Sequence, residues 1–135
     1  MEEVMKIQGI LYSPGGRIEY LLLRRPDSRG GVWGPVTGHV EKGERLLDAL
    51  QREIEEETGI SELTYIIDLR VPFRYSKGEQ NVEEHSFGVQ VNTKDVRLSN
   101  EHSAYSWLPY EEAMARLTWP NQKTSLQVLN DMINL

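Results

Sequence analysis

The sequence predicts a mixed α/β sandwich, in which a β-sheet lies between helices. Three observations indicate this class. Short apolar segments near the N-terminus alternate with turns, one amphipathic helix interrupts the predicted strands, and two further helices follow the last strand. The chain has 135 residues, the length of one domain, so we expect residues 1–135 to form a single domain.

The N-terminal part of the chain is predicted to form a β-hairpin followed by a loop. Met5–Tyr12 and Ile18–Arg25 are short and rich in apolar residues, as buried strands are. The Ser-Pro-Gly-Gly stretch at 13–16 predicts the turn between them. Residues 26–35 contain Pro, Asp, Ser and three glycines, so they are predicted to be a loop.

A helix is predicted over residues 45–58. Apolar residues recur there on one side at helical spacing, at Leu46, Leu47, Leu50 and Ile54. Gly59 then ends the run, because glycine readily adopts the left-handed conformation that closes a helix.

Three more strands are predicted in the second half of the chain. Residues 63–71, closed by Pro72, and the apolar runs at 86–91 and 105–108 have the length and composition of strands. The polar segment 74–84 between the first two is expected to be a mobile excursion.

Two helices are predicted to complete the chain. Pro109 suits the first turn of a helix that ends near Leu117. The last helix is expected to begin at Asn121 and to direct three apolar side chains to one face, namely Leu126, Leu129 and Met132.

Composition and charge exclude several classes of function. The formal net charge of −6 argues against a broad electrostatic contact with nucleic acid, although a small phosphorylated ligand remains compatible if a metal supplies positive charge. Cysteine is absent, which excludes disulfides, thiolate nucleophiles, zinc fingers and iron–sulfur clusters. No apolar run is long enough for a membrane span, and the N-terminus lacks the layout of a signal peptide. We therefore expect a cytoplasmic protein.

Carboxylates crowd the end of the predicted central helix, where four of the five residues from 53 to 57 are glutamates. Like charges three or four positions apart repel one another, and the C-terminal end of a helix is already negative. At about 100° per residue, Glu57 falls within the apolar stripe and Glu53 at its edge. A carboxylate that points toward the core is costly unless it is paired or bound to a metal.

Two interpretations of these glutamates remain open. The first is a solvated acidic face, which we accept for Glu55. The second, for Glu53, Glu56 and Glu57, is a site for a hard divalent cation such as Mg²⁺, which prefers carboxylate oxygens. Arg52 is either a surface residue or the partner that holds one of these carboxylates in place.

Residues 38–60 also match a known pattern. The chain reads Gly38, five residues, Glu44, seven residues, Arg-Glu-Ile at 52–54, one residue, Glu-Glu at 56–57, one residue, and Gly-Ile at 59–60. This segment resembles the Nudix box of the Nudix hydrolases at every defining position. The resemblance implies the Nudix α/β/α sandwich with a mixed β-sheet. It also implies hydrolysis of a nucleoside diphosphate linked to another group, with Mg²⁺ or Mn²⁺ as cofactor.

The same resemblance implies roles for individual residues. Metal ligands are expected at Gly38, through its carbonyl, and at Glu53, Glu56 and Glu57. Glu53 is in addition a candidate catalytic base, Arg52 would orient a glutamate, and Glu44 would have a structural or outer role. The family often takes its base from a glutamate on a later loop.

Residues 101–108 provide such a later candidate. They read Glu-His-Ser-Ala-Tyr-Ser-Trp-Leu, which resembles the Glu-His-x-x-Tyr-x-Trp-Leu stretch of the dihydroneopterin triphosphate pyrophosphatases, a subfamily that also acts on dATP. There the glutamate joins the metal site, so the resemblance assigns Glu101 to it. Spacing alone favours a surface glutamate and a structural histidine.

Four further residues are candidates for substrate binding. Arg25 resembles the position at which that subfamily places an arginine on the triphosphate, and a salt-bridged strand end is the alternative. Thr37 either contacts ligand or completes a turn. Trp33 and Trp119 either stack on a base or pack within the protein.

The sequence thus predicts an enzyme that hydrolyses a phosphoric anhydride bond. The leading hypothesis is a pyrophosphohydrolase that converts a nucleoside triphosphate, such as dATP, or dihydroneopterin triphosphate into the monophosphate and pyrophosphate. A dinucleoside polyphosphate hydrolase is the alternative, because Gly-His-Val-Glu-Lys-Gly-Glu at 38–44 also occurs in that group. A non-catalytic nucleotide-binding Nudix module is the third possibility. We expect a small-molecule partner, no protein or membrane partner, and a monomer or homodimer.

Overall fold

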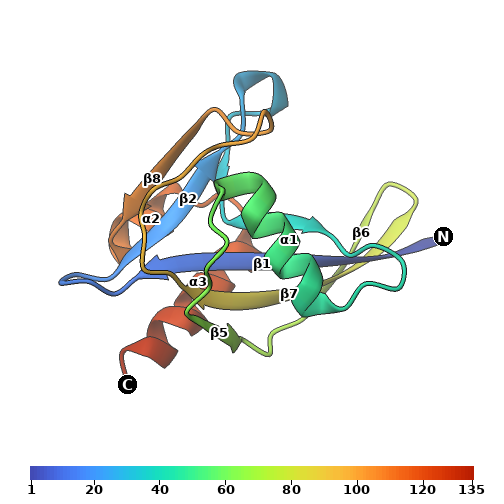
Figure 1. The fold of residues 1–135 in the computed structure, drawn as a ribbon. Coiled ribbons are helices and arrows are strands. Elements are labelled where there is room, and N and C mark those ends of the chain that lie inside the picture. The colour runs from blue at the N-terminus through green and yellow to red at the C-terminus, as the bar shows by residue number, and fades with distance from the viewer.

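The computed structural model describes residues 1–135 and has a mixed β-sheet with helices on both faces (Figure 1). The strands are β1 (Glu2–Ser13), β2 (Glu19–Arg24), β3 (Trp33–Gly34), β4 (Val36–His39), β5 (Tyr65–Asp68), β6 (Phe73–Lys77), β7 (Gln80–Gln90) and β8 (Ala104–Leu108). The helices are α1 (Leu46–Thr58), α2 (Tyr110–Arg116) and α3 (Pro120–Ile133), with a short 3-10 helix, η1, at Asp27–Arg29. None of the helices is both long and apolar enough to cross a lipid bilayer.

Strand β1 lies at the centre of the sheet. The order of the main path is β3-β2-β1-β7-β5, and β4, β6 and β8 pair with β1, β7 and β2 respectively. The β1–β7 pair is parallel and the other pairs are antiparallel, which confirms the predicted mixed sheet. In this register Lys6 is the partner of Glu84 on β7, and Ile7 is the partner of Gly38 on β4.

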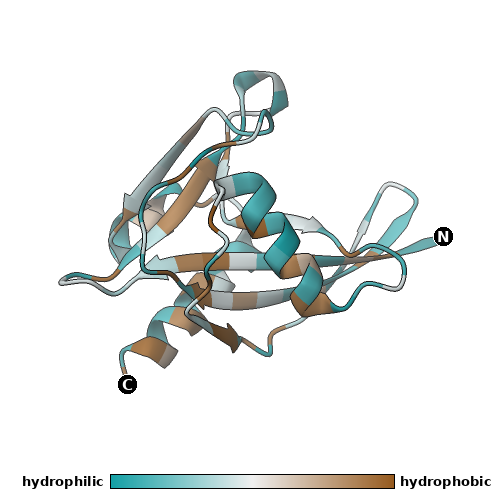
Figure 2. Ribbon diagram, in the orientation of Figure 1, coloured by the Kyte–Doolittle hydropathy of each residue, from teal (hydrophilic) through white to brown (hydrophobic).

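Alternate residues of the sheet pack against helices on opposite faces. One core joins the sheet to α1 and includes Ile7, Leu11, Leu50, Ile54 and Val89. The other joins it to α2 and α3 and includes Ile10, Tyr20, Ala113, Leu126 and Leu129. Figure 2 shows hydrophobic residues in the central strands, whereas the outward side of α1 is mostly hydrophilic. The predicted α/β/α sandwich is confirmed.

The central helix forms where apolar spacing predicts it. Leu50 and Ile54 are fully buried, and Gly59 (φ 75°) ends the helix by donating its N–H to the carbonyl of Glu55 at 2.9 Å. Leu47 is an exception to the predicted apolar face, since 53% of it is exposed. Met132 of α3 is a second exception at 38% exposed, since the apolar face of the helix is continued by Ile133, which packs against the core.

The segment predicted to be a mobile excursion is instead a β-hairpin. Strands β6 and β7 pair across a turn at Gly78 (φ 60°), and Arg74 of β6 forms an ion pair with Glu83 of β7 at 2.9 Å. The prediction was wrong because a strand with one solvated face is polar at alternate positions, and charged cross-strand pairs stabilise it. Strand β4 was also not predicted, since its glycine and histidine conceal its pairing with β1.

Candidate active site

The glutamates of helix α1 differ in how far they are exposed to solvent. Glu57 is buried, with 4% of its surface exposed, and the side chain of Glu53 is 12% exposed. Both therefore point inward, as the helical spacing predicts. Glu55 is exposed, which agrees with a solvated face. Glu56 is more exposed, with 54% of its side chain accessible, because it lies on the side of Glu53 away from the apolar stripe.

The backbone of β4 makes room for Glu53. A Cβ atom built on Gly38 would collide with Cγ, Cδ and Oε1 of the Glu53 side chain, so only glycine allows this carboxylate to lie against the strand. Burial raises the pKa of Glu53, and a hydrogen bond from Arg52 acts in the opposite direction. The helix and the strand are thus fitted to each other at the carboxylate.

Arg52 connects helix α1 to the two segments that precede it. Its Nε and Nη2 donate to both carboxylate oxygens of Glu44 at 2.9 and 3.0 Å, and Nη2 also donates to the carbonyl of His39 at 2.9 Å. Its Nη1 donates to Oε1 of Glu53 at 2.8 Å. The hydrogen bonds that Glu44 accepts from Arg52 lower the pKa of its carboxyl group to about 2. One planar guanidinium thus holds the loop, strand β4 and the helix together.

Glu57 is held from the segment before β8. His102 Nδ1 donates to Oε2 of Glu57 at 2.7 Å, and the hydroxyl of Ser99 donates to the same oxygen at 2.9 Å. Burial alone would raise the pKa of the Glu57 carboxyl, but these hydrogen bonds hold it below its usual range. A hydrogen bond with Glu57 raises the pKa of Glu101, so Glu101 lies beside this carboxylate.

This donor set fits a hard divalent cation. The inward carboxylates of Glu53 and Glu57 and the neighbouring Glu56 and Glu101 are oxygen donors of the kind that Mg²⁺ prefers, and the backbone of Gly38 lies directly against the Glu53 side chain. In this structure the carboxylates are bound by Arg52, His102 and Ser99, and no three acidic or histidine side chains are gathered into a metal-binding group.

A pocket of about 730 Å³ opens on the face of the sheet that carries α3. All four residues that the sequence suggests for substrate binding line it, namely Arg25, Trp33, Thr37 and Trp119. His102 also lines the pocket and therefore connects it to Glu57. Trp33 contacts the guanidinium of Arg116 at 4.8 Å from the ring centroid, whereas 52% of Trp119 is exposed.

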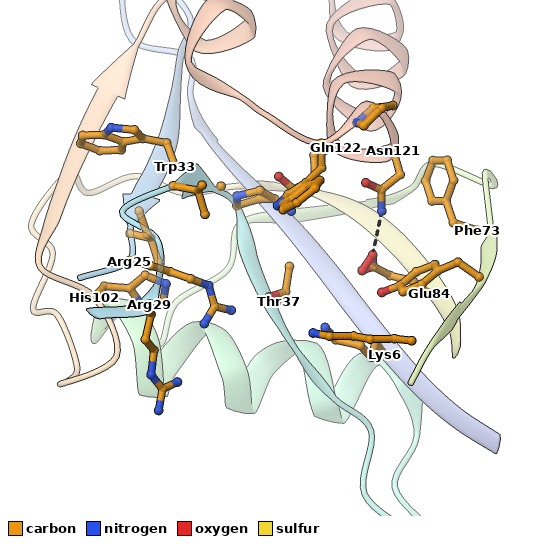
Figure 3. A pocket seen from close by; sticks show the side chains of 18 of the residues that line it. Lys6, Arg25, Arg29, Trp33, Thr37, Phe73, Glu84, His102, Asn121 and Gln122 are labelled. Carbon is orange, nitrogen blue, oxygen red and sulfur yellow. Dashed lines mark hydrogen bonds between the residues drawn. The ribbon is translucent and has the colours of Figure 1, made fainter. Parts of the chain in front are cut away.

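The two ends of the pocket differ in chemistry (Figure 3). Arg25, Arg29 and His102 lie at one end, and Lys6, Glu84, Asn121 and Phe73 lie at the other, with Thr37 between the two groups. Sequence reasoning missed Lys6, Arg29, Phe73 and Glu84 because they are isolated in the sequence. The sequence offers a clue only for Glu84, because a charged residue close to the apolar run at 86–91 is a candidate for a functional role.

Glu84 is a buried carboxylate, with 2% of its surface exposed. The side-chain amide of Asn121 donates to its Oε1 at 3.2 Å. Burial raises the pKa of Glu84, and the charge of Lys6 opposes that rise. Burial likewise lowers the pKa of Lys6, and the charge of Glu84 opposes that change.

Comparison with known protein families matches the NUDIX domain over residues 6–129, which is most of the chain. The chain belongs to the Nudix family. Members of the Nudix family hydrolyse pyrophosphate bonds and generally use divalent metals, so this Nudix protein is a hydrolase of phosphoric anhydride bonds.

Its Nudix relatives differ in the substrates that their names state. The asymmetrical bis(5'-nucleosyl)-tetraphosphatase of Mus musculus is 38% identical over 82% of this chain and 77% of its own length. Nucleoside triphosphatase NudI of Salmonella newport is 35% identical over 69% of this chain and 74% of its own length. An octanoyltransferase of Myxococcus xanthus is 37% identical over 84% of this chain, but the match spans only 32% of that protein.

Solved Nudix structures have the same fold. The dihydroneopterin triphosphate pyrophosphohydrolase of E. coli is similar over 93% of this chain and 95% of its own, with a TM-score of 0.79 and 25% sequence identity. The Ap4A hydrolase of C. elegans, solved as a binary complex, covers 97% of this chain and 98% of its own with a TM-score of 0.83, and its 24% identity establishes the fold alone.

Proposed function

We propose that this Nudix hydrolase is a Mg²⁺-dependent pyrophosphohydrolase that converts a nucleoside triphosphate or dihydroneopterin triphosphate into the monophosphate and pyrophosphate. The observation that carries the proposal is the pocket lined by Arg25 and Arg29, whose lining residue His102 is hydrogen-bonded to Glu57 of the acidic helix. A chain of phosphates that follows the arginines would thus meet the carboxylates. The activities for which NudI and the E. coli pyrophosphohydrolase are named support a triphosphate substrate.

Each group of residues has a distinct part in this proposal. Mg²⁺, or Mn²⁺ in its place, would be held by Glu53, Glu56, Glu57 and Glu101 and by the carbonyl of Gly38. When bound, the metal supplies the positive charge and Lewis acidity that hydrolysis of an anhydride needs. Glu53 and Glu101 are the two candidates for the base that takes a proton from the attacking water.

The remaining site residues bind and orient. Arg25 and Thr37 would hold the phosphates that do not react, since a guanidinium and a hydroxyl both donate to phosphate oxygens. Trp33 and Trp119 would stack on an organic group of the substrate close to the phosphates, since Trp33 lies at the Arg25 end of the pocket (Figure 3). Arg52 would act as a positioning residue, because it holds Glu53 and Glu44.

Arg52→Lys is expected to lower kcat roughly 10- to 100-fold, the usual cost of removing a group that orients a ligand of the metal. A lysine has one compact donor group and cannot reproduce the planar set of contacts with Glu44, Glu53 and the His39 carbonyl. Steady-state kinetics at varied Mg²⁺ checks this, and the Mg²⁺ concentration at half-activity should rise in parallel. Arg45→Lys is the matched control, since Arg45 is exposed and pairs only with Asp48. Equal effects from both variants would contradict a positioning role for Arg52.

A dinucleoside polyphosphate hydrolase is the second candidate. The 38% identity with the mouse tetraphosphatase over 82% of this chain favours it, and so does the exposure of Trp119 at the margin of the pocket, where a second nucleoside could stack.

A panel of five substrates separates these candidates. dATP, dihydroneopterin triphosphate, diadenosine tetraphosphate, ADP-ribose and 8-oxo-dGTP would each be incubated with Mg²⁺, and the products separated by chromatography. A monophosphate and pyrophosphate from a triphosphate support the proposal, whereas ATP and AMP formed most rapidly from diadenosine tetraphosphate support the alternative. Binding of these compounds without turnover, in Mg²⁺ or Mn²⁺, would instead indicate a non-catalytic module.

A further inference from the structure

The face of the sheet beneath the pocket contains a charged pair that the chemistry at α1 does not use. Lys6 of β1 and Glu84 of β7 are register partners in the parallel pair, so their side chains leave the sheet on the same face. Both line the pocket, and no ion pair within 4.0 Å joins them. The carboxylate of Glu84 is 2% exposed and accepts a hydrogen bond from Asn121, but it has no cationic partner within ion-pair distance, and a buried charge of this kind is costly.

The position of the acidic helix relative to the pocket indicates which part of a substrate meets Glu84. Lys6, Arg74 and Lys77 line the pocket as well as Arg25 and Arg29, so positive charge alone does not place the phosphates. His102, which is hydrogen-bonded to Glu57, lies at the end with Arg25 and Arg29, and the carboxylate of Glu84 repels phosphate, so the reacting phosphates belong at the His102 end. Glu84 lies at the opposite end from these arginines (Figure 3). The organic ring of the substrate, rather than its phosphates, therefore reaches Glu84.

Hydrogen-bonding chemistry narrows the choice of ring. An ionised carboxylate only accepts hydrogen bonds, and its two oxygens suit two adjacent donors. Guanine presents N1–H beside its 2-amino group, and a pterin presents N3–H beside its 2-amino group, each next to a ring carbonyl that an ammonium group can bind. Adenine and cytosine place an unprotonated ring nitrogen beside the amino group, which a carboxylate would repel.

We propose that Glu84 accepts the ring N–H and the 2-amino group of a 2-amino-4-oxopyrimidine ring, the edge shared by guanine and pterins, while Lys6 donates to its carbonyl oxygen. This inference rests on the proposed function for its position beside a phosphate-binding end, and it narrows the substrate class of the same site. It predicts that the protein binds guanine and pterin compounds more tightly than adenine nucleotides.

Two neighbouring features agree with this assignment. The aromatic rings of Phe73 and Tyr75 line the same pocket, and Phe73 lies at the Glu84 end, where a flat heterocycle could stack on it. The side-chain amide of Gln122 also lines the pocket, and its Oε1 is buried without a hydrogen-bond partner. A buried acceptor of this kind is stabilised by a ligand that brings additional N–H donors.

Binding of product nucleotides tests the proposal without requiring turnover. Isothermal titration calorimetry would measure dGMP and dAMP binding to the full-length protein and to Glu84→Gln. The wild-type protein is expected to bind dGMP roughly 10- to 100-fold more tightly than dAMP, the discrimination of one bidentate base contact. In Glu84→Gln this preference should vanish or reverse, because an amide offers one donor and one acceptor and so matches adenine. Glu83→Gln is the matched control, since the adjacent Glu83 points to the other face and pairs with Arg74.

Lys6→Met provides a second variant, which should weaken dGMP binding and leave dAMP binding unchanged. A wild-type protein without a preference for dGMP, or a preference retained in Glu84→Gln, would overturn the proposal.

Turnover of dGTP, dihydroneopterin triphosphate and dATP is measured in parallel. If dGMP is preferred but no triphosphate is hydrolysed, the proposed function fails and the base assignment stands. If triphosphates are hydrolysed without any preference for guanine or pterin, the base assignment fails and the function stands.

Discussion

Glu57→Gln is expected to lower kcat roughly 10³-fold for the best triphosphate substrate, with little change in the fold. A bound metal contributes several kcal/mol to the stabilisation of the transition state, and about 1.4 kcal/mol corresponds to a factor of ten in rate. Glutamine has the size of glutamate and can still accept hydrogen bonds from His102 and Ser99, so the packing of α1 is preserved. It lacks the charge that binds a cation.

Two measurements accompany this variant. Pyrophosphate release gives kcat, and Mn²⁺ binding followed by electron paramagnetic resonance gives the affinity for the metal, which should fall in parallel. Glu55→Gln is the matched control, because Glu55 is exposed on the same helix and is not assigned to the site. A Glu57→Gln protein that hydrolyses substrate as fast as the parent would refute the role of α1 as a metal-binding helix.

Gly38→Ala is expected to lower kcat roughly 10²-fold and the free energy of unfolding by about 1–3 kcal/mol. The added methyl group would occupy the space that the Glu53 side chain now fills, so either the strand or the carboxylate must move. A displacement of about 1 Å at a catalytic group is enough for a rate loss of this size. Kinetics and thermal unfolding would measure the two effects.

A double-mutant cycle identifies the cause of this loss. In a Glu53→Ala background the side chain that collides is absent, so adding Gly38→Ala should cost little further stability. Gly15→Ala serves as the control, since a Cβ atom at Gly15 meets no atom within 4 Å. A Gly38→Ala penalty that is unchanged in the Glu53→Ala background would show that backbone strain, and not the collision with Glu53, is responsible.

The sequence predicts the acidic helix well because its signal is local. Apolar spacing, the terminating Gly59 and the inward register of Glu53 and Glu57 all depend on residues within a few turns of one helix. The substrate-binding face is less predictable. Lys6 and Glu84 are brought together by the register of a parallel strand pair, and nothing in either local segment specifies that register.

Contacts between segments that are distant in the sequence also explain the other differences between the predicted and the observed structure. The polar hairpin of β6 and β7 lacks the apolar alternation from which a strand is predicted, yet its ion pairs and its turn stabilise it. His102 was assigned a structural role because one histidine in a loop has no partner in the sequence. Its partner, Glu57, lies in a separate element, and only the folded chain brings the two together.

The alternation of side chains along β1 has a consequence for how this enzyme can diversify. Ile7 packs beneath α1, while its neighbour Lys6 faces the pocket. The proposed recognition residues and the proposed catalytic helix therefore lie on opposite sides of one shared strand. Changes at the pocket-facing positions could redirect the enzyme to a new heterocycle without disturbing the hydrolytic apparatus, which would allow closely related chains to acquire different cellular targets.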